Sequence, residues 1–279
     1  MGAIITFTTD FGLSDAYVAA MKGVILGINP EAKLIDICHT IKPQNISQAA
    51  FVLSTAYRFF PQKTVHLAVV DPRVGTEQRA VILRTPMADF VAPDNGLLSY
   101  VIKELSVNQI ADNDNLQQRE LAPGLEAVEI TKSKFWRTPT STTFHGRDIF
   151  APVAALLSLG FPPINFGEAI TSLTMLPLAG TYQRPDGSLV GHIIHIDNFG
   201  NLITNIRGSD LSLIKEPITV EIGDRVISGQ SNTYAEGSGL LALIGSSGYL
   251  EVSLRGGSAS AFLEAEVGSE VKLGRQQEK

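Results

Sequence analysis

The chain has 279 residues, of which 44% are hydrophobic and 18% charged, so it can bury a sizeable core and is not a disordered chain. Its formal net charge is −6, and its 22 Lys and Arg residues never form a run, which argues against a nucleic-acid partner. The single cysteine, Cys38, excludes an intramolecular disulfide and a thiolate zinc site, and it fits a cytoplasmic protein.

The first part of the chain alternates between predicted strands and predicted helices. Residues 3–9 are β-branched and aromatic, and apolar residues then recur at helical spacing from Ala16 to Ile28. The alternation continues with strands at Lys33–Ile37, Thr64–Val70 and Ala80–Leu83, and helices at Ile46–Phe59, Asn95–Leu105 and Asp148–Leu159. Nearly all-apolar strands are expected where helices cover both faces of a sheet. We therefore predict an N-terminal α/β domain, with a central mostly parallel sheet, over residues 1–178.

The pattern changes after Ser188, where short strand-like segments are separated by Gly, Ser and Asn. These segments are Leu189–Ile196, Leu202–Ile206, Ile218–Ile222, Leu240–Ile244 and Tyr249–Leu254. They predict a smaller β domain over residues 188–274, joined by a linker at 176–187. The longest uncharged run, 149–167, contains three prolines and Gly160, which would break a membrane-spanning helix, so no membrane association is expected.

Two polar clusters follow strands of the predicted sheet. The first contains Asp10 and Asp15 after the opening strand, and the second begins with Asp71 after a buried strand. Ligands bind at the carboxyl ends of parallel strands, where carboxylates can hold hydroxyls or cations. Two alternatives stay open: Asp15 or Ser14 can simply cap the next helix, and Asp71-Pro72 can simply form a turn.

Two further clusters lie later in the chain. His145 stands just before an apolar helix, and a histidine there can position water or transfer a proton, although a lone histidine is more often structural. In 197–201, Phe199 stands beside Asn198 between two strands of the second domain. An exposed aromatic ring next to an amide suits a planar base, whereas a simple hairpin loop is the alternative.

Together the clusters resemble one family, the S-adenosyl-L-methionine (SAM) hydroxide adenosyltransferases, which are related to the fluorinase and the chlorinase. The matching strings span residues 8–251 and are TTDFGLSDAYVAAMKG, DICHTIKPQNI, VVDPRVGTEQRA, APDNGLL, TFHGRDIFAPVAA, IDNFGNLITNI and SSGYLE. The resemblance implies an N-terminal α/β domain, a C-terminal β-barrel domain, and a homotrimer with active sites between subunits. It also implies hydrolysis of SAM to adenosine and L-methionine by attack of water on the ribose C5′ carbon, with SAM as substrate and no cofactor or metal.

The resemblance also implies which residues bind the substrate. Asp10 would hold the ribose hydroxyls, Asp15 and Asp197 would face the methionine part, and Phe199 with Asn201 would hold the adenine. The same strings add three further substrate-binding candidates, which are Phe144, Ser246 and Glu251.

The choice of nucleophile also follows from the resemblance. The hydroxide enzymes surround a water molecule with Asp, Arg and His, and Asp71 and His145 match the first and last of these. The arginine position, seven residues after the aspartate, is Gln78 here, so Arg73 or the neighbouring Arg79 is the expected substitute, and Arg79 is named as the third catalytic residue. The halogenases differ at the positions of Asp71 and His145, and the segment Arg84–Asp89 is short where they have an insertion. Both differences favour water over halide. Gln44 replaces the Trp-like packing of the halogenases.

Three other functions are weighed against hydrolysis. The missing arginine favours a non-catalytic sensor that binds SAM or adenosine and leaves it intact. A metal-dependent phosphohydrolase would need Asp10, Asp71 and Asp94 to converge on a cation. A nicotinamide enzyme is unsupported because no G-x-G-x-x-G follows the first strand. The matching strings favour the hydrolase.

Overall fold

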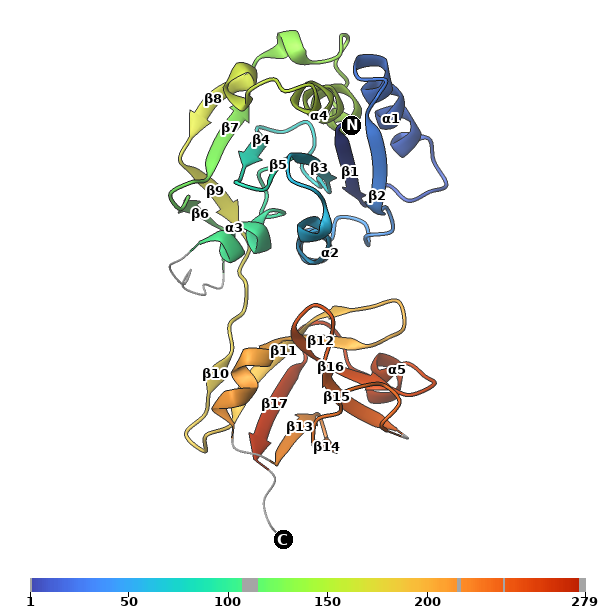
Figure 1. Ribbon diagram of the computed structural model, residues 1–279, viewed down its shortest axis with the longest axis vertical. Coiled ribbons are helices and arrows are strands. Elements are labelled where there is room, and N and C mark those ends of the chain that lie inside the picture. Colours follow the sequence, from blue (N-terminus) through green and yellow to red (C-terminus); the bar gives the residue numbers. More distant parts are fainter. Residues whose placement is uncertain (1, 107–114, 215–216, 238, 276–279) are drawn as a thin grey trace. The chain divides into compact units, whose positions relative to one another are not determined.

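The computed structural model describes residues 2–106, 115–214, 217–237 and 239–275. The chain divides into two compact units, Met1–Pro177 and Leu178–Lys279 (Figure 1). Each unit has its own sheet and its own hydrophobic core. Within the described ranges, no helix is long and apolar enough to cross a membrane.

The N-terminal unit is built on a seven-stranded mixed sheet with the strand order β2-β1-β3-β5-β4-β7-β8. Its parallel part consists of β2 (Lys33–Cys38), β1 (Ile4–Thr9), β3 (Thr64–Val69) and β5 (Ala88–Pro93). The sheet is extended by antiparallel β4 (Ala80–Arg84), β7 (Glu126–Ile130) and β8 (Gly167–Ile170). Thr9 of β1 pairs with Val69 of β3, so these two strands end at the same edge. Asp10 and Asp71 follow them there.

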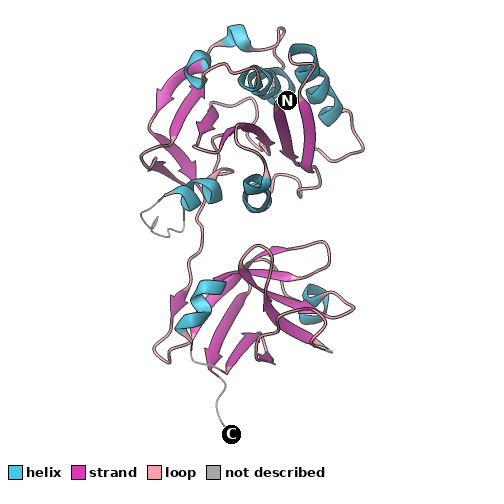
Figure 2. Cartoon of the chain, in the orientation of Figure 1, coloured by secondary structure: helices cyan, strands magenta, loops and turns pink. Residues whose placement is uncertain are grey.

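Helices cover both faces of this sheet (Figure 2). On one face α1 (Tyr17–Ile28) packs against α4 (Ala151–Ser158), over a core that includes Phe7 of β1. On the other face lie α2 (Ile46–Ala56) and α3 (Ser99–Leu105). Burying one large apolar side chain contributes about 1.5–3 kcal/mol to the free energy of unfolding. The two cores, one on each face of the sheet, therefore fix the strand ends that carry the polar clusters.

The helices and strands differ from the predicted ones mainly at their ends. The helix predicted from Asp148 begins as a π-helical turn, Gly146–Phe150, and the one predicted from Asn95 begins only at Ser99. The helix predicted to reach Phe59 ends as a 3₁₀ turn after Ala56. β5, β7 and β8 were not predicted, nor was a separate two-stranded sheet formed by β6 (Gln117–Glu120) and β9 (Ser172–Met175).

The C-terminal unit is a curved, barrel-like antiparallel sheet with the order β14-β13-β17-β11-β12-β16-β15, and β10 pairs with β11. Its strands are β10 (Tyr182–Gln183), β11 (Leu189–Ile196), β12 (Leu202–Arg207), β13 (Ile218–Ile222), β14 (Arg225–Ser228), β15 (Leu240–Ile244), β16 (Tyr249–Leu254) and β17 (Glu270–Arg275). One short helix, α5 (Ala259–Leu263), packs against β16. The predicted fold class, an α/β part followed by an antiparallel β-barrel part, is confirmed.

Candidate active site

The turn after β1 carries Asp10 and is held by the loop that follows β2. Oδ2 of Asp10 accepts a hydrogen bond of 2.8 Å from the backbone N–H of Gln44. Gly12, with φ +69°, donates its N–H to the carbonyl oxygen of His39 at 2.8 Å. Gln44 itself has φ +65°, a left-handed conformation that costs a non-glycine residue about 1–2 kcal/mol. The loop is therefore strained at the residue whose N–H holds Asp10.

Asp71 lies just beyond β3, and its side chain is tied through one oxygen. Oδ1 accepts hydrogen bonds from Nε2 of Gln78 at 2.6 Å and from the backbone N–H of Arg73 at 3.1 Å. Burial raises the pKa of Asp71 above its usual value, and these hydrogen bonds and the charges of His145 and Arg73 offset only part of that rise. A carboxylate with a raised pKa is a stronger proton acceptor near neutral pH than an ordinary aspartate.

His145 immediately precedes the π-helical turn that starts α4. Asp148 fixes this turn: its side chain is fully buried, and it accepts hydrogen bonds from the Arg147 guanidinium at 2.7 Å and from the backbone N–H of Ser141 at 2.8 Å. The Arg147 guanidinium lies over the Phe144 ring, 5.0 Å from its centroid. π-helical turns occur frequently at functional sites, and this one places His145 at the surface of a cavity.

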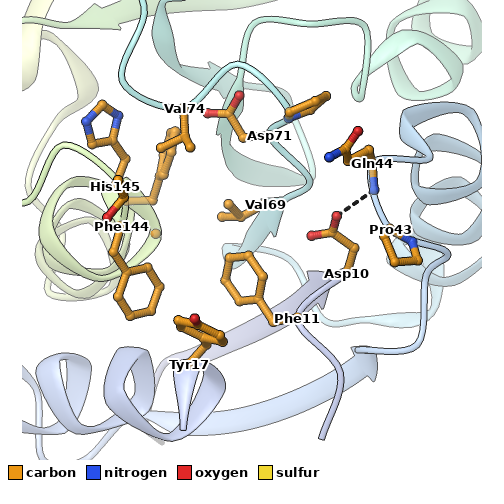
Figure 3. A pocket seen from close by; sticks show the side chains of 14 residues that line it. Asp10, Phe11, Tyr17, Pro43, Gln44, Val69, Asp71, Val74, Phe144 and His145 are labelled. Atoms are coloured by element: carbon orange, nitrogen blue, oxygen red, sulfur yellow. Dashed lines mark hydrogen bonds between the residues drawn. The ribbon is translucent and has the colours of Figure 1, made fainter. Parts of the chain in front are cut away.

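Asp10, Asp71 and His145 line a single cavity of about 400 Å³ (Figure 3). Figure 3 shows Asp10 on the opposite side of this cavity from Phe144. The remaining lining residues come mostly from the same turns and are Phe11, Tyr17, Pro43, Gln44, Val69, Pro72, Val74, Thr143, Gly146 and Phe150. The structure therefore brings together two of the three predicted catalytic residues and two predicted substrate ligands, Asp10 and Phe144.

Three aromatic rings form one wall of the cavity, which we call the aromatic wall: Phe11, Tyr17 and Phe144. Tyr17 meets Phe144 edge-on with 5.1 Å between centroids, and Phe11 lies 5.9 Å from Phe144. Tyr17 keeps 49% of its surface exposed. Aromatic faces attract cations and stack on planar groups, so this wall suits a ligand that carries both. Phe11 and Tyr17 were not among the predicted site residues.

Arg79 does not line the cavity. Its guanidinium pairs with Asp94, whose side chain is only 3% exposed, through Nε at 3.0 Å. It also donates to the Gln118 side chain at 3.0 Å and to the Ser172 carbonyl at 3.2 Å. Gln78 and Arg79 lie just before β4, and their side chains have different partners: Gln78 reaches Asp71, whereas Arg79 reaches Asp94.

The same ion pair removes Asp94 from any carboxylate cluster with Asp10 and Asp71. Asp94 is held by Arg79 and by the backbone N–H of Thr174 at 2.7 Å. Across the part of the chain that is described, no group of three or more His, Cys, Asp and Glu side chains is arranged to hold a metal ion. Asp10, Asp71 and Asp94 therefore do not converge on one cation, as the phosphohydrolase alternative requires.

Asp15 is exposed and lies just before α1, outside the cavity. Ala16 occupies the N-cap position of α1, and no side chain makes a capping hydrogen bond there. The alternative that Asp15 or Ser14 caps this helix is therefore wrong. The side chain of Asp15 stays available for a ligand.

In the C-terminal unit, the loop between β11 and β12 is organised by Asp197. Its carboxylate accepts hydrogen bonds of 2.9 Å from the backbone N–H groups of Phe199 and Asn201 and from the Asn201 side chain. Gly200 has φ +81°, and a Cβ there would come within 2.0 Å of Oγ of Ser258, so the position requires glycine. The hairpin alternative explains these bonds, but it leaves Phe199 75% exposed on a fixed loop without a reason.

Glu251 lies on β16 and is 6% exposed. Its Oε1 accepts hydrogen bonds from the hydroxyls of Tyr234 at 2.7 Å and Ser253 at 2.8 Å. The bond to Glu251, burial and the nearby Asp197 carboxylate together raise the pKa of Tyr234 to about 12, so Tyr234 stays neutral beside both acids. Ser246 is exposed in the turn between β15 and β16. Tyr234 lies on a polar loop with no periodic pattern, and it was not among the predicted site residues.

Comparison with known proteins finds relatives over nearly the whole chain. Family models described as the SAM hydroxide adenosyltransferase N-terminal and C-terminal domains match residues 5–167 and 191–272. A Methanocaldococcus jannaschii protein named (R)-S-adenosyl-L-methionine hydrolase is 35% identical, over 97% of this chain and 95% of its own length. A fluorinase of Nocardia brasiliensis is 29% identical over 97% of each chain. The crystal structure of an uncharacterized conserved protein from Thermotoga maritima superimposes with a TM-score of 0.85 at 35% identity, over 97% of this chain and 100% of that one.

Proposed function

The chain belongs to the SAM hydroxide adenosyltransferase family, and we propose that it hydrolyses SAM to adenosine and L-methionine. One observation carries the proposal: Asp71 and His145 line the same cavity as Asp10. A proton acceptor and a histidine thus share a cavity with a carboxylate that can hold ribose hydroxyls. Four relatives named as SAM hydrolases, at 34–35% identity over 95–98% of their own lengths, support the same activity.

In the proposed reaction, water attacks C5′ of the ribose in line with the sulfonium sulfur. The new C–O bond forms as the C–S bond breaks, and the electron pair of that bond goes to sulfur, which leaves as the neutral thioether of methionine. The proton that the water loses passes to Asp71, with His145 holding or sharing it. Near-attack placement can supply roughly 7–11 kcal/mol, and general acid–base catalysis about 10²–10⁴-fold in rate.

The hydrogen bonds of Asp71 indicate which oxygen takes the proton. Both bonds from Gln78 and Arg73 end on Oδ1, so we assign the water to Oδ2. Gln78 acts as the donor that orients Asp71 in place of an arginine. Arg79 was the expected third catalytic residue, but its ion pair with Asp94 assigns it to holding the β6–β9 sheet against β4.

The substrate roles complete the proposal. Asp10 holds the ribose hydroxyls, and the aromatic wall faces the positively charged sulfonium. The other ligands are Asp15 and Asp197 for the methionine part, and Phe199 and Asn201 for the adenine. Ser246, in the turn before β16, and Glu251, on β16, are the two remaining candidates. No cofactor or metal is required, because the sulfonium already makes methionine a good leaving group.

We also propose a homotrimer with active sites between subunits, acting in the cytoplasm. Leu13 and Phe199 are each 75% exposed on loops that carry proposed substrate ligands, as expected of residues that a ligand or a neighbouring subunit covers. The cytoplasmic location is supported by the single cysteine. Light scattering of the purified protein tests the trimer directly.

The experiment that tests hydrolysis uses purified protein, SAM and a chelator in H₂¹⁸O without halide. The (R) and (S) sulfonium epimers are supplied separately, because the named relatives carry the (R) prefix. We expect adenosine carrying ¹⁸O at the 5′ position, and methionine, from the wild type but not from Asp71→Asn. Unlabelled adenosine would contradict attack by water.

The sensor alternative keeps one specific observation in its favour: the cavity lining contains no arginine side chain to stabilise hydroxide. It predicts that the wild type binds SAM in calorimetry and leaves it intact over hours. That outcome would replace the hydrolase proposal.

A further inference from the structure

A buried histidine that the proposed reaction does not use is tied to the end of β1. His39 follows β2 and is 4% exposed, and its Nδ1 lies 2.8 Å from Oγ1 of Thr9. Its Nε2 lies 3.0 Å from Oδ1 of Asp36, whose Oδ2 accepts a hydrogen bond of 2.7 Å from Lys22. A line of polar contacts therefore runs from Lys22 and Asp36, both partly exposed, to the residue just before Asp10.

The direction of these bonds follows from the donors available. The Thr9 hydroxyl accepts a hydrogen bond of 3.3 Å from the backbone N–H of Phe11. The carboxylate of Asp36, 3.0 Å from Nε2, can only accept, so the neutral ring places its proton on Nε2, and Nδ1 accepts the proton of the Thr9 hydroxyl. Thr9 thus links the His39 side chain to the backbone of the turn that contains Asp10.

His39 also fixes this turn through its own backbone. Its carbonyl accepts the N–H of Gly12, and five residues later the N–H of Gln44 holds Asp10. The segment from His39 to Gln44 and the turn from Thr9 to Gly12 are therefore joined at three points. The strained φ of Gln44 persists only where its surroundings hold it, and the His39 anchor is part of those surroundings.

We infer that the Thr9–His39 hydrogen bond is a positioning device that sets the affinity of the site for the ribose of its substrate. Neither side chain lines the cavity, so the pair acts through Asp10 and not by touching the ligand. The inference rests on the proposed function, because it takes Asp10 as the ribose ligand. It predicts a loss in binding with little change in the chemical step.

β1 carries a second pair of the same kind, which supplies a matched control. Oγ1 of Thr6 lies 2.7 Å from Nδ1 of His66, and both residues are fully buried, as Thr9 is. The His66 ring stacks on Phe90 with 4.9 Å between centroids, and neither Thr6 nor His66 lines the cavity. Loss of the hydroxyl should therefore destabilise the fold to a similar extent at both positions, whereas only Thr9 is joined to Asp10.

The experiment compares Thr9→Val with Thr6→Val, since each exchange replaces a buried hydroxyl by a methyl group. Calorimetry gives the Kd for adenosine, and initial rates give KM and kcat for SAM. We expect Thr9→Val to raise Kd and KM about tenfold, the size of effect of one lost hydrogen bond, with kcat within about twofold of wild type. Thr6→Val should leave all three unchanged, while both variants lower Tm by similar amounts.

Two substitutions of His39 separate its two contacts. His39→Asn keeps a polar atom near the position of Nδ1, toward Thr9, and should retain most of the affinity for adenosine. His39→Gln keeps one near Nε2, toward Asp36, and should resemble Thr9→Val.

An unchanged Kd in Thr9→Val, or an equal loss in Thr6→Val, would overturn the positioning role while leaving wild-type hydrolysis intact. A wild type that neither binds adenosine nor cleaves SAM would overturn the proposed function and this inference with it.

Discussion

Nε2 of Gln78 donates a hydrogen bond of 2.6 Å to Oδ1 of Asp71, so a neutral amide orients the carboxylate at the position where the family resemblance leads one to expect an arginine. An amide supplies the directional bond of an arginine without its positive charge. Burial then raises the pKa of Asp71 with no cation directly bonded to the carboxylate to reverse the shift. The result is a more basic carboxylate and a weaker field for stabilising hydroxide.

Asp71→Asn should remove the proton acceptor while keeping the shape of the site. Its amide oxygen can still accept from Gln78, so we expect kcat to fall about 10²–10⁴-fold with KM close to wild type. Initial rates of adenosine release measure this. Glu77→Gln, an isosteric change on an exposed residue of the same loop, is the control and should keep full activity. A similar fall in both variants would point to disturbance of the loop and not to loss of a base.

Variants of Gln78 should move the pH dependence of kcat in opposite directions. The reaction needs ionised Asp71, so kcat falls on the acid side as this carboxyl is protonated. Gln78→Ala removes a hydrogen bond that lowers the pKa of Asp71, so the acid limb should move to higher pH, with kcat/KM roughly three- to tenfold lower at pH 7. Gln78→Arg adds a cation, and the limb should move to lower pH. If the acid limb of the pH profile of kcat lies at the same pH in wild type, Gln78→Ala and Gln78→Arg, Asp71 is not the titrating base.

The sequence pattern predicts the α/β class because apolar periods of helices and strands alternate clearly, but it misses strands stabilised by partners far along the chain. β5 contains Asp89, which breaks the apolar run. In the structure Asp89 pairs across the antiparallel ladder with Arg84, whose Nε and Nη2 each donate a hydrogen bond of 2.7 Å to its carboxylate. A cross-strand pair of this kind is invisible to periodicity.

The late start of α3 has a similar cause. The side chain of Asn95 donates to the carbonyl oxygen of Val70 at 2.9 Å, and Gly96 has φ +95°, so the chain turns there before the helix begins. The first bond reaches 25 residues back along the chain, and helical periodicity does not report it.

The site was predictable as far as it depends on where strands end. Asp10 and Asp71 follow neighbouring parallel strands, so topology alone brings them together. The choice between Gln78 and Arg79 was not predictable, because it depends on Asp94, which follows β5 and pairs with the arginine. The role of Gln44 as a backbone donor was not predictable either, because it depends on a left-handed φ that a non-glycine residue rarely adopts.

The aromatic wall should contribute more to binding the SAM cation than to binding neutral adenosine. Phe144→Leu and Tyr17→Leu keep apolar bulk but remove a ring, which is worth roughly 0.5–2 kcal/mol to a nearby cation, or about 2–30-fold in Kd. Calorimetry in the Asp71→Asn background, where SAM is not consumed, measures both ligands. Phe161→Leu, a partly exposed aromatic residue outside the cavity, serves as control. Equal losses for SAM and adenosine would assign the wall to the nucleoside instead.

Arg79→Met should lower stability and leave catalysis intact. The substitution strands the nearly buried Asp94 carboxylate, and because Arg79 is 26% exposed we expect a loss of about 2 kcal/mol, below that of a fully buried pair. Adding Asp94→Asn should restore part of this loss, and denaturant titrations of both single variants and the double variant measure the coupling. Loss of kcat without loss of stability would return Arg79 to the reaction, as its place beside Gln78 first indicated.

Asp148→Asn tests whether the π-helical turn holds His145 in place. The Arg147 guanidinium lowers the pKa of the buried Asp148 carboxyl in the folded protein. A lowered folded-state pKa means that the ionised group stabilises the fold above the unfolded-state pKa of about 3.9, and that this stabilisation is lost as pH falls through the lower, folded value. The Tm of the variant should therefore lie below that of wild type at pH 7, and the difference should shrink toward acid pH.

Asp89→Asn breaks a comparable ion pair outside the cavity, with Arg84, and is the matched control. We expect both variants to lose Tm, but only Asp148→Asn to lose kcat, by about tenfold or more, because only Asp148 anchors the turn that presents His145. If both variants keep full kcat, His145 keeps its position without the Arg147–Asp148 pair. The feature that holds it is then the close approach of Met21 and Phe11 to Gly146, where a Cβ would come within 3.2 and 3.4 Å of their side chains.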